Sequence, residues 1–387
     1  MVNQIAEFTA SQTGDASDED QQLEAVRSSV ERFFFQKCSY FIPAVYVLYV
    51  VFEYIDQPVF PDALLDLVKI TTQIVFVIAF ILANRFFEAI PYTISQLFSS
   101  SAITQKTSDT KLKKFSYQSF VNDLDSWLNR GHRRIMGVLG ALFALTYYMI
   151  RTGGPSELVE QAAFSLAFVD LILYILPTVI YAYFAGIVVW KLLVTSRKIG
   201  AIPLEFDVNV QFGHPDGAGG LLPVGLLCLS MVYVTIAPTF RAVLIFLASY
   251  IGENLDFPHI VANDILLLGF APVILIVGII GSIVALSPMH AFHQVMLKHR
   301  HEIARLLNRV SAEIVALKEQ IATMPQNAEM RAVDETLKRI SDLETFYGSH
   351  QNINTWPMNR QVLIRVWASF VFLIAQVVAL WNFISSF

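Results

Sequence analysis

The chain has 387 residues, of which 55% are hydrophobic and only 15% are charged, whereas soluble globular proteins carry about 25% charged residues. The net charge of −5 and the two cysteines exclude a basic nucleic-acid-binding protein and a disulfide-rich secreted domain. The apolar residues form stretches of the roughly 20 residues that cross a bilayer. The composition therefore predicts a multi-pass integral protein of the plasma or an inner membrane, with no cofactor, metal site or nucleic-acid partner.

Seven apolar segments are expected to form transmembrane helices, which defines an all-α membrane fold. These segments are Cys38–Phe60, Leu67–Phe86, Arg134–Ile150, Ala162–Leu192, Leu222–Ile251, Ile265–Leu286 and Val362–Phe387. Lys and Arg favour cytosolic connections. With the N-terminus in the cytosol, all but three of the 27 basic residues fall on the cytosolic side, the exceptions being Lys69, Arg151 and Arg241. The sequence therefore predicts a cytosolic N-terminus and an external C-terminus.

The spans divide the chain into four parts. Residues 1–37 form a cytosolic tail that is largely disordered at its start, and residues 38–289 form a six-span membrane domain with cytosolic connections at 99–133 and 194–220. A cytosolic helical hairpin follows at 290–350. A linker and the seventh span complete the chain at 351–387.

The predicted hairpin carries apolar residues at alternating steps of four and three, which is the spacing of a coiled-coil seam. These residues are Ile303, Leu307, Val310, Ile314, Leu317, Ile321 and Met324. Pro325 ends the helix, and a second amphipathic run begins near Met330. Two interpretations stay open: the hairpin closes on itself, or the seam joins copies of the chain.

Two further cytosolic segments have regular patterns. Residues 111–134 place Phe115, Phe120, Leu124 and Trp127 at helical spacing among basic residues, which indicates either an interfacial helix on anionic lipid or a continuation of the third span. Residues 204–212 alternate apolar and polar side chains, which is typical of a half-buried strand.

A glycine-rich turn follows this strand and contains His214, Asp216 and Gly217. Pro215 at the second position and Gly217 at the fourth fit a type I turn. The turn is interpreted either as structural, allowing the chain to re-enter the bilayer, or as functional. In the functional interpretation, His214 and Asp216 would form a cation site, a proton-linked switch or an acid–base pair.

Polar residues in the outer halves of the spans predict either a ligand-binding vestibule or an ion pair within an ordinary interfacial aromatic belt. Asp170 and Arg241 are expected at similar depth, where they could pair, because ionisable residues within spans are rare and usually functional. The ligand-binding candidates are Tyr49, Glu53, Tyr148, Asp170, Tyr174 and Arg241.

The seventh span stands apart because the long cytosolic segment precedes it. Its polar residues Ser369, Gln376 and Asn382 could make one face of the helix accessible to water. Gln376 could equally form an interhelical hydrogen bond. The chain has no hydrolase, zinc-protease, Walker or dinucleotide motif, so it is not expected to be an enzyme.

This order of parts resembles that of insect gustatory and odorant receptors. In that family the last span carries Thr-Tyr, five hydrophobic residues and then Gln-Phe; the matching stretch here is Ser369-Phe370-Val371-Phe372-Leu373-Ile374-Ala375-Gln376-Val377. The resemblance implies a tetrameric, ligand-gated cation channel. The seventh span, with Phe372, would line its pore, Gln376 would lie near the gate, and the ligand cavity would lie among the outer halves of the other spans.

The expected function is therefore an oligomeric membrane channel, gated by a small-molecule ligand and permeable to cations, with the bilayer and other copies of the chain as partners. The alternative is a non-conducting membrane scaffold or sensor that presents the cytosolic hairpin to a partner. A membrane enzyme that uses His214 and Asp216 is the third interpretation.

Overall fold

The computed structural model describes residues 31, 33–38, 44, 48, 60–104, 116–151, 176–210, 214, 216–254, 258–323, 330–350 and 356–385. Within these ranges it describes only the backbone at 36, 38, 60–73, 147–148, 150–151, 241–254, 258–275, 330–332, 349–350, 377 and 379–385. The described part is almost wholly helical, in agreement with the all-α prediction.

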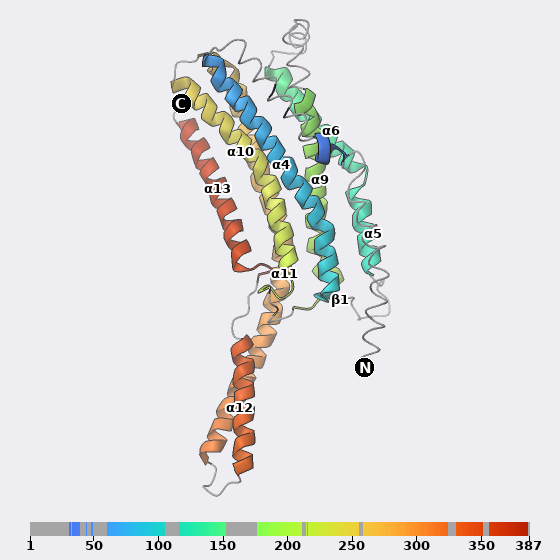
Figure 1. Ribbon diagram of the computed structural model, residues 1–387, viewed down its shortest axis with the longest axis vertical. Coiled ribbons are helices and arrows are strands. Elements are labelled where there is room, and N and C mark those ends of the chain that lie inside the picture. The colour runs from blue at the N-terminus through green and yellow to red at the C-terminus, as the bar shows by residue number, and fades with distance from the viewer. Residues whose placement is uncertain are drawn as a thin grey trace.

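The helices form an elongated bundle from which a two-helix arm projects (Figure 1). The bundle contains α4 (Phe60–Ser99), α6 (His132–Arg151), α9 (Leu176–Glu205), α10 (Leu222–Asn254), the first half of α11 (Pro258–Thr323) and α13 (Arg360–Ser385). The rest of α11 and α12 (Met330–His350) make the arm. The C-terminal end of α13 lies at the opposite end of the molecule from the arm.

Four helices contain segments long and apolar enough to cross a membrane, among the residues whose side chains are described. These segments are Ile74–Ser99, Leu176–Glu205, Leu222–Phe240 and Ile276–Thr323. The protein therefore has the helices of a membrane protein. The prediction of seven spans and their orientation goes beyond this finding, and most of the first predicted span and residues 162–175 of the fourth lie outside the described residues.

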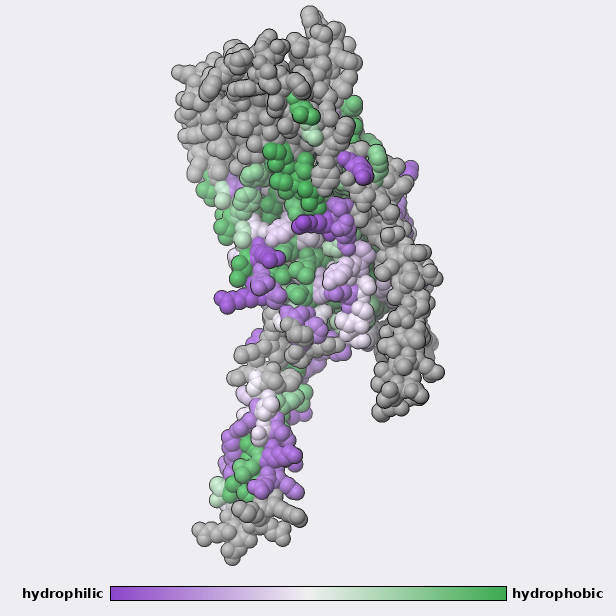
Figure 2. Space-filling model, in the orientation of Figure 1, coloured by the Kyte–Doolittle hydropathy of each residue, from purple (hydrophilic) through white to green (hydrophobic). Residues whose placement is uncertain are grey.

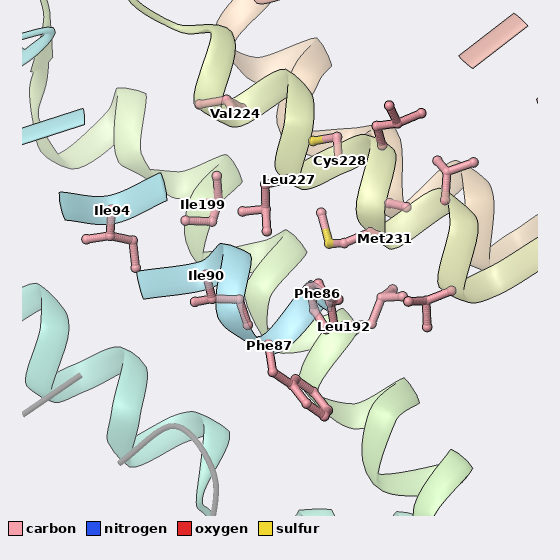
Figure 3. Close-up of a cluster of buried hydrophobic side chains, with 14 of the residues drawn as sticks. Phe86, Phe87, Ile90, Ile94, Leu192, Ile199, Val224, Leu227, Cys228 and Met231 are labelled. Carbon is pink, nitrogen blue, oxygen red and sulfur yellow. The ribbon is translucent and has the colours of Figure 1, made fainter. Parts of the chain in front are cut away.

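The core is formed where α4, α9 and α10 meet (Figure 3). Helix α4 runs 13 residues beyond the predicted end of its span at Phe86, because Ile90, Ile94 and Leu97 are fully buried. These α4 residues pack with α9 and α10 side chains that include Leu192, Ile199, Val224, Leu227, Cys228 and Met231. The helical pattern of α4 therefore continues past the length that the bilayer alone requires.

Small residues allow α6 and α9 to approach closely. A Cβ atom at Gly140 would overlap the carbonyl oxygen of Ala182, and one at Gly186 would overlap that of Met136. Backbone contact through glycine and alanine is a common way for helices to associate in membranes, where the hydrophobic effect does not drive them together.

Helix α11 crosses α9 at a proline. Pro288 has no N–H, so the carbonyl of Val284 loses the hydrogen bond that an α-helix would give it. Ser196 of α9 supplies the missing donor: its Oγ lies 2.5 Å from the Val284 oxygen and 2.9 Å from Ser287 Oγ.

The arm is a helical hairpin closed within one chain. Ile314 of α11 and Ile340 of α12 are both buried, and two ion pairs join the helices, Lys318–Glu344 at 2.7 Å and Arg339–Glu313 at 2.6 Å. At its centre, the predicted seam therefore packs α11 against α12. Helix α11 runs without interruption through residue 290, the predicted boundary between the membrane domain and the hairpin.

In its described part, residues 116–134, the segment between α4 and α6 differs from both interpretations of its sequence, and Phe115 lies outside the described residues. Helix α5 (Tyr117–Leu128) is separated from α6 by a turn at 129–131, so it does not continue the third span. Its apolar residues Phe120, Val121, Leu124 and Leu128 are buried in the protein, with Phe120 against Phe206. It therefore does not offer this face to lipid.

The predicted strand at 204–212 is mostly not formed. Helix α9 includes Leu204 and Glu205, because the helix continues past the point where the alternating pattern begins. Within residues 204–210, the only strand is β2 (Asp207–Val208), which pairs antiparallel with β1 (Ile103–Thr104), whereas residues 211 and 212 lie outside the described residues. This small sheet joins the ends of α4 and α9.

Candidate functional site

Helix α13 packs on α10 through one narrow face. Its buried residues, spaced by alternating steps of four and three, are Val362, Val366, Ser369, Leu373 and Gln376. Phe372 contacts the ring of Phe240 of α10, with 5.8 Å between the ring centroids. This heptad spacing matches that of two helices packed side by side.

The start of α13 is fixed by three contacts. Asn359 caps the helix, since its Oδ1 accepts a hydrogen bond of 3.0 Å from the Val362 N–H. The Pro357 carbonyl lies so close to α10 that a Cβ at Gly225 would overlap it. Trp356 stacks on His293 of α11, with 4.0 Å between the ring centroids. The linker before α13 therefore touches both α10 and the helix that carries the arm.

Gln376 is the most unusual residue of this helix. Its side chain is only 4% exposed, yet neither its amide nitrogen nor its amide oxygen has a hydrogen-bond partner among the described residues. A buried polar group without a partner costs about 1–3 kcal/mol. By contrast, Ser369 directs its hydroxyl to the Arg365 carbonyl of its own helix at 2.8 Å.

The opposite face of α13 is apolar and uncovered in the single chain. It carries the exposed residues Ile364, Trp367, Val371, Ile374 and Val378. Residues two positions apart differ by about 200° around a helix, so Gln376 lies nearly opposite Ile374 and Val378. In this conformation Gln376 and Ser369 face α10, and an apolar stripe faces outward.

The predicted ligand-binding residues cannot be assembled into a site from the described residues. Tyr49, Glu53, Asp170 and Tyr174 lie outside them. Tyr148 lies on α6 and Arg241 on α10, where only the backbone is described, and the same holds for Asn382 on α13. The vestibule and the Asp170–Arg241 pair therefore stay predictions.

A groove of about 320 Å³ lies between α4 and α10 in the described part of the bundle. Its walls are apolar apart from one tyrosine, and it contains none of the predicted ligand-binding residues. It is lined by Val75, Ile78, Leu82, Tyr233, Ile236, Ala237 and Phe240.

The glycine-rich turn shapes the start of α10. Asp216 Oδ1 accepts a hydrogen bond from the Ala218 N–H at 2.8 Å, and Oδ2 accepts from the N–H groups of Gly220 and Leu222 at 3.0 and 3.3 Å. Burial raises the pKa of this carboxyl, but these bonds and the contact with His214 outweigh it, so the pKa lies below its usual value of 3.8. The Asp216 carboxylate therefore acts as a hydrogen-bond acceptor for backbone N–H groups.

The other two turn residues support the same geometry. The His214 carbonyl accepts a hydrogen bond of 3.0 Å from the Gly217 N–H, which closes the predicted four-residue turn. Gly217 has φ +65°, a conformation that is strained for residues with a Cβ. The His214 Nδ1 lies 2.9 Å from Asp216 Oδ1, so the two side chains meet as predicted. These contacts show that the three residues shape the turn, and the functional interpretation of His214 and Asp216 stays a prediction.

A buried charge cluster joins three segments that are distant in sequence. Lys191 of α9 is fully buried, and its Nζ lies 2.6 Å from Glu31 Oε2. Arg133 at the start of α6 lies 3.2 Å from the other carboxylate oxygen. The Lys191 ammonium also lies 5.0 Å from the centre of the Phe87 ring.

The segment that carries Glu31 is held by aromatic packing. Phe34 and Phe35 belong to the short π-helix η2 (Phe34–Cys38) and are buried against α4 and α9. Phe34 stacks on Phe184 at 3.7 Å, and Phe35 meets Phe87 edge to face at 5.2 Å. The N-terminal segment is thus attached to the bundle by both charge and aromatic contacts.

Sequence reasoning missed this cluster. In the sequence, Lys191 and Arg133 serve only to predict the orientation of the spans in the membrane. A signal was nevertheless present, because Lys191 lies inside the predicted span Ala162–Leu192, and a lysine among apolar residues in a span needs a partner. The partner itself, more than 150 residues away, has no sequence signature.

Comparison of the chain with protein-family models, with curated proteins and with solved structures returned no match. The resemblance to insect gustatory and odorant receptors therefore stays a prediction from the order of parts and the nine residues Ser369–Val377.

Proposed function

We propose that the protein is an oligomeric membrane channel in which α13 lines the conduction pathway. The observation that supports this most is Gln376: a buried amide with no hydrogen-bond partner in the described part of the chain, on a helix that is otherwise apolar at that level. An unpaired buried amide lowers the stability of the folded protein, whereas water in a hydrated pathway would form hydrogen bonds with it. A pore must offer polar groups of this kind to an ion that has lost part of its water.

The position of α13 also supports the proposal. The helix lies at the edge of the bundle (Figure 1) and packs mainly on α10, which leaves most of its surface for other copies of the chain. In the proposed assembly, which the receptor resemblance makes a tetramer, the stripe of Trp367, Val371 and Ile374 faces the central axis. An apolar constriction excludes water, so the described conformation is the closed state.

Opening then requires α13 to turn or shift so that Ser369 and Gln376 reach the pathway. The His293–Trp356 stack and the Pro357–Gly225 contact connect the start of α13 to α11 and α10. Through them, a movement of these helices would reach α13. In the proposal, a ligand bound toward the outer halves of the spans drives this movement, and cations are the permeant ions.

Ion flux from liposomes that contain the purified chain tests the proposal. Gln376→Glu would place a carboxylate in the pathway and is expected to raise the preference for cations, whereas Gln376→Leu should reduce flux. Gln361→Leu is the matched control, because Gln361 is exposed near the start of the same helix, and it should leave flux unchanged.

Gln376→Leu has a second expected effect that does not depend on function. Replacing a buried, unpaired amide by an apolar side chain of similar size should stabilise the protein by about 1–3 kcal/mol. Lower flux together with a higher unfolding temperature would identify Gln376 as a residue kept for conduction. Flux that both substitutions leave unchanged would remove Gln376 from the pathway, and a strict monomer in detergent would contradict the channel.

We also propose a second candidate, a non-conducting scaffold or sensor, because of the projecting arm. The arm is largely hydrophilic (Figure 2), yet Leu306, Val315, Leu337 and Phe346 are exposed on it. These apolar residues would contact a soluble partner. Absence of flux in all conditions, with specific binding of a partner to the arm, would favour this function over the channel.

A further inference from the structure

The turn between α5 and α6 lies at the edge of an apolar surface. Between Ile135 and Phe143, one side of α6 exposes only apolar residues, namely Ile135, Val138, Leu139, Leu142 and Phe143. Such a stripe on a helix of the membrane bundle faces lipid tails. The residues immediately before Ile135 therefore lie at the level of the lipid headgroups.

Two arginines occupy this level. Arg130 and Arg134 are separated by one helical turn in sequence, and both are exposed. The Arg130 guanidinium lies 4.3 Å from the centre of the Trp127 ring. Trp127 is joined to α9, because its carbonyl accepts a hydrogen bond of 3.2 Å from Trp190 Nε1, and His132 stacks on Trp190 at 5.5 Å. Tryptophans with basic neighbours are typical of the membrane interface.

The nearby carboxylates are engaged with other groups. Glu31 pairs with Arg133 and Lys191, and Asp123 pairs with Lys198. Asp125 accepts a hydrogen bond of 2.8 Å from Asn129, and burial raises the pKa of its carboxyl despite that bond and the nearby Lys191 and Arg133.

These pairings leave a local excess of positive charge. Among the described residues, no carboxylate forms an ion pair with Arg130 or Arg134. Their two guanidinium groups are therefore available to an anion in the headgroup region.

We propose that Arg130 and Arg134 bind the headgroup of an anionic phospholipid. A guanidinium can hold a phosphate with two parallel hydrogen bonds, and the Ile135–Phe143 stripe lies where the acyl chains of the same lipid would run. The continuity of charged and apolar surface favours a lipid over a free phosphate. The proposed lipid site requires that the chain is embedded in a bilayer, but it does not require that the protein conducts ions.

Affinity of the purified full chain for dioctanoyl phosphatidylserine, with dioctanoyl phosphatidylcholine as the neutral comparison, tests the proposal. Each basic residue near an anionic lipid surface contributes about fivefold in binding. The double variant R130Q/R134Q is therefore expected to lose about 25-fold in affinity for phosphatidylserine and to leave phosphatidylcholine unchanged.

The matched control is R305Q/R309Q, which removes two exposed arginines of the same spacing from α11 far along the chain from the α5–α6 turn. It should retain the affinity for phosphatidylserine. Equal losses in the two double variants would overturn the site, because binding would then follow net charge alone. Inorganic phosphate that displaces phosphatidylserine at equal concentration would show a free-anion site and would overturn the lipid assignment.

A measurement on the unaltered chain covers the case in which R130Q/R134Q does not fold. Brominated acyl chains quench nearby tryptophan fluorescence, and Trp127 and Trp190 lie at the proposed site. Brominated phosphatidylserine should quench more than brominated phosphatidylcholine at the same mole fraction in liposomes. Equal quenching by the two lipids would overturn the proposal.

Discussion

The Glu31–Lys191 pair provides a sharp test of how the N-terminal segment is held. Glu31→Gln removes the carboxylate that lies 2.6 Å from a fully buried ammonium and 3.2 Å from Arg133, so two cations lose the charge between them. Breaking a buried ion pair from one side costs about 3–5 kcal/mol. Lys191→Met should cost less, because Glu31 keeps Arg133, whose side chain is partly exposed and also donates to Asn129 at 2.6 Å.

The unfolding temperature of the purified protein in detergent measures these effects. A loss of 3–5 kcal/mol corresponds to a decrease of about 4–6 °C for a chain of 387 residues. Glu344→Gln is the matched control, since it removes one side of the exposed pair with Lys318, and exposed pairs contribute at most about 1 kcal/mol.

The double variant separates coupling from local damage. If Glu31 and Lys191 stabilise each other, the combination of Glu31→Gln and Lys191→Met should be less destabilising than the sum of the two single changes, by about 1–3 kcal/mol. Strictly additive losses would refute the reasoning, because the two side chains would then contribute independently.

Two further predictions concern packing and capping. Gly186→Ala should destabilise the protein by about 1–3 kcal/mol, because the added Cβ forces α6 away from α9. Gly348→Ala is the control, at a helical position with open space, and should stabilise the protein by about 0.5–1 kcal/mol. Equal effects of the two substitutions on thermal unfolding would contradict the close contact between α6 and α9. Asp216→Ala should cost about 2 kcal/mol by removing the acceptor at the start of α10. Because the folded pKa of Asp216 lies below 3.8, its contribution is present above that pH and is lost as the pH falls through the folded pKa, so the difference between wild type and Asp216→Ala should shrink in acid.

Periodicity in the sequence located most helices because each apolar segment is long and regular. The start of α10 and the turn before it were also accessible, since Pro215 and Gly217 have distinct backbone requirements. The end of α4 at Ser99 was missed because a hydropathy window measures length in lipid, whereas Ile90, Ile94 and Leu97 are buried by other helices.

Contacts between distant segments could not be predicted from one sequence. Alternation at 204–212 indicated a strand, but the two-residue sheet depends on Ile103 and Thr104, about a hundred residues earlier. The sequence of the seam at Ile314 fits an intramolecular hairpin as well as an oligomer, and the burial of Ile340 on α12 is what shows the hairpin within the chain. Gln376 was identified from its residue type, but the direction of its side chain depends on how α13 packs on α10.

The crossing of α11 over α9 divides the long helix α11 into two segments of similar length. The helix extends about 45 Å from Pro288 to its start at Pro258 and about 53 Å to its end at Thr323, at 1.5 Å per residue. With Ser196 holding the crossing point as a pivot, a sideways displacement of about 5 Å at the tip of the arm corresponds to about 4 Å in the opposite direction at the far end. A rigid rotation of α11 about this point would therefore move its two ends by similar distances in opposite directions.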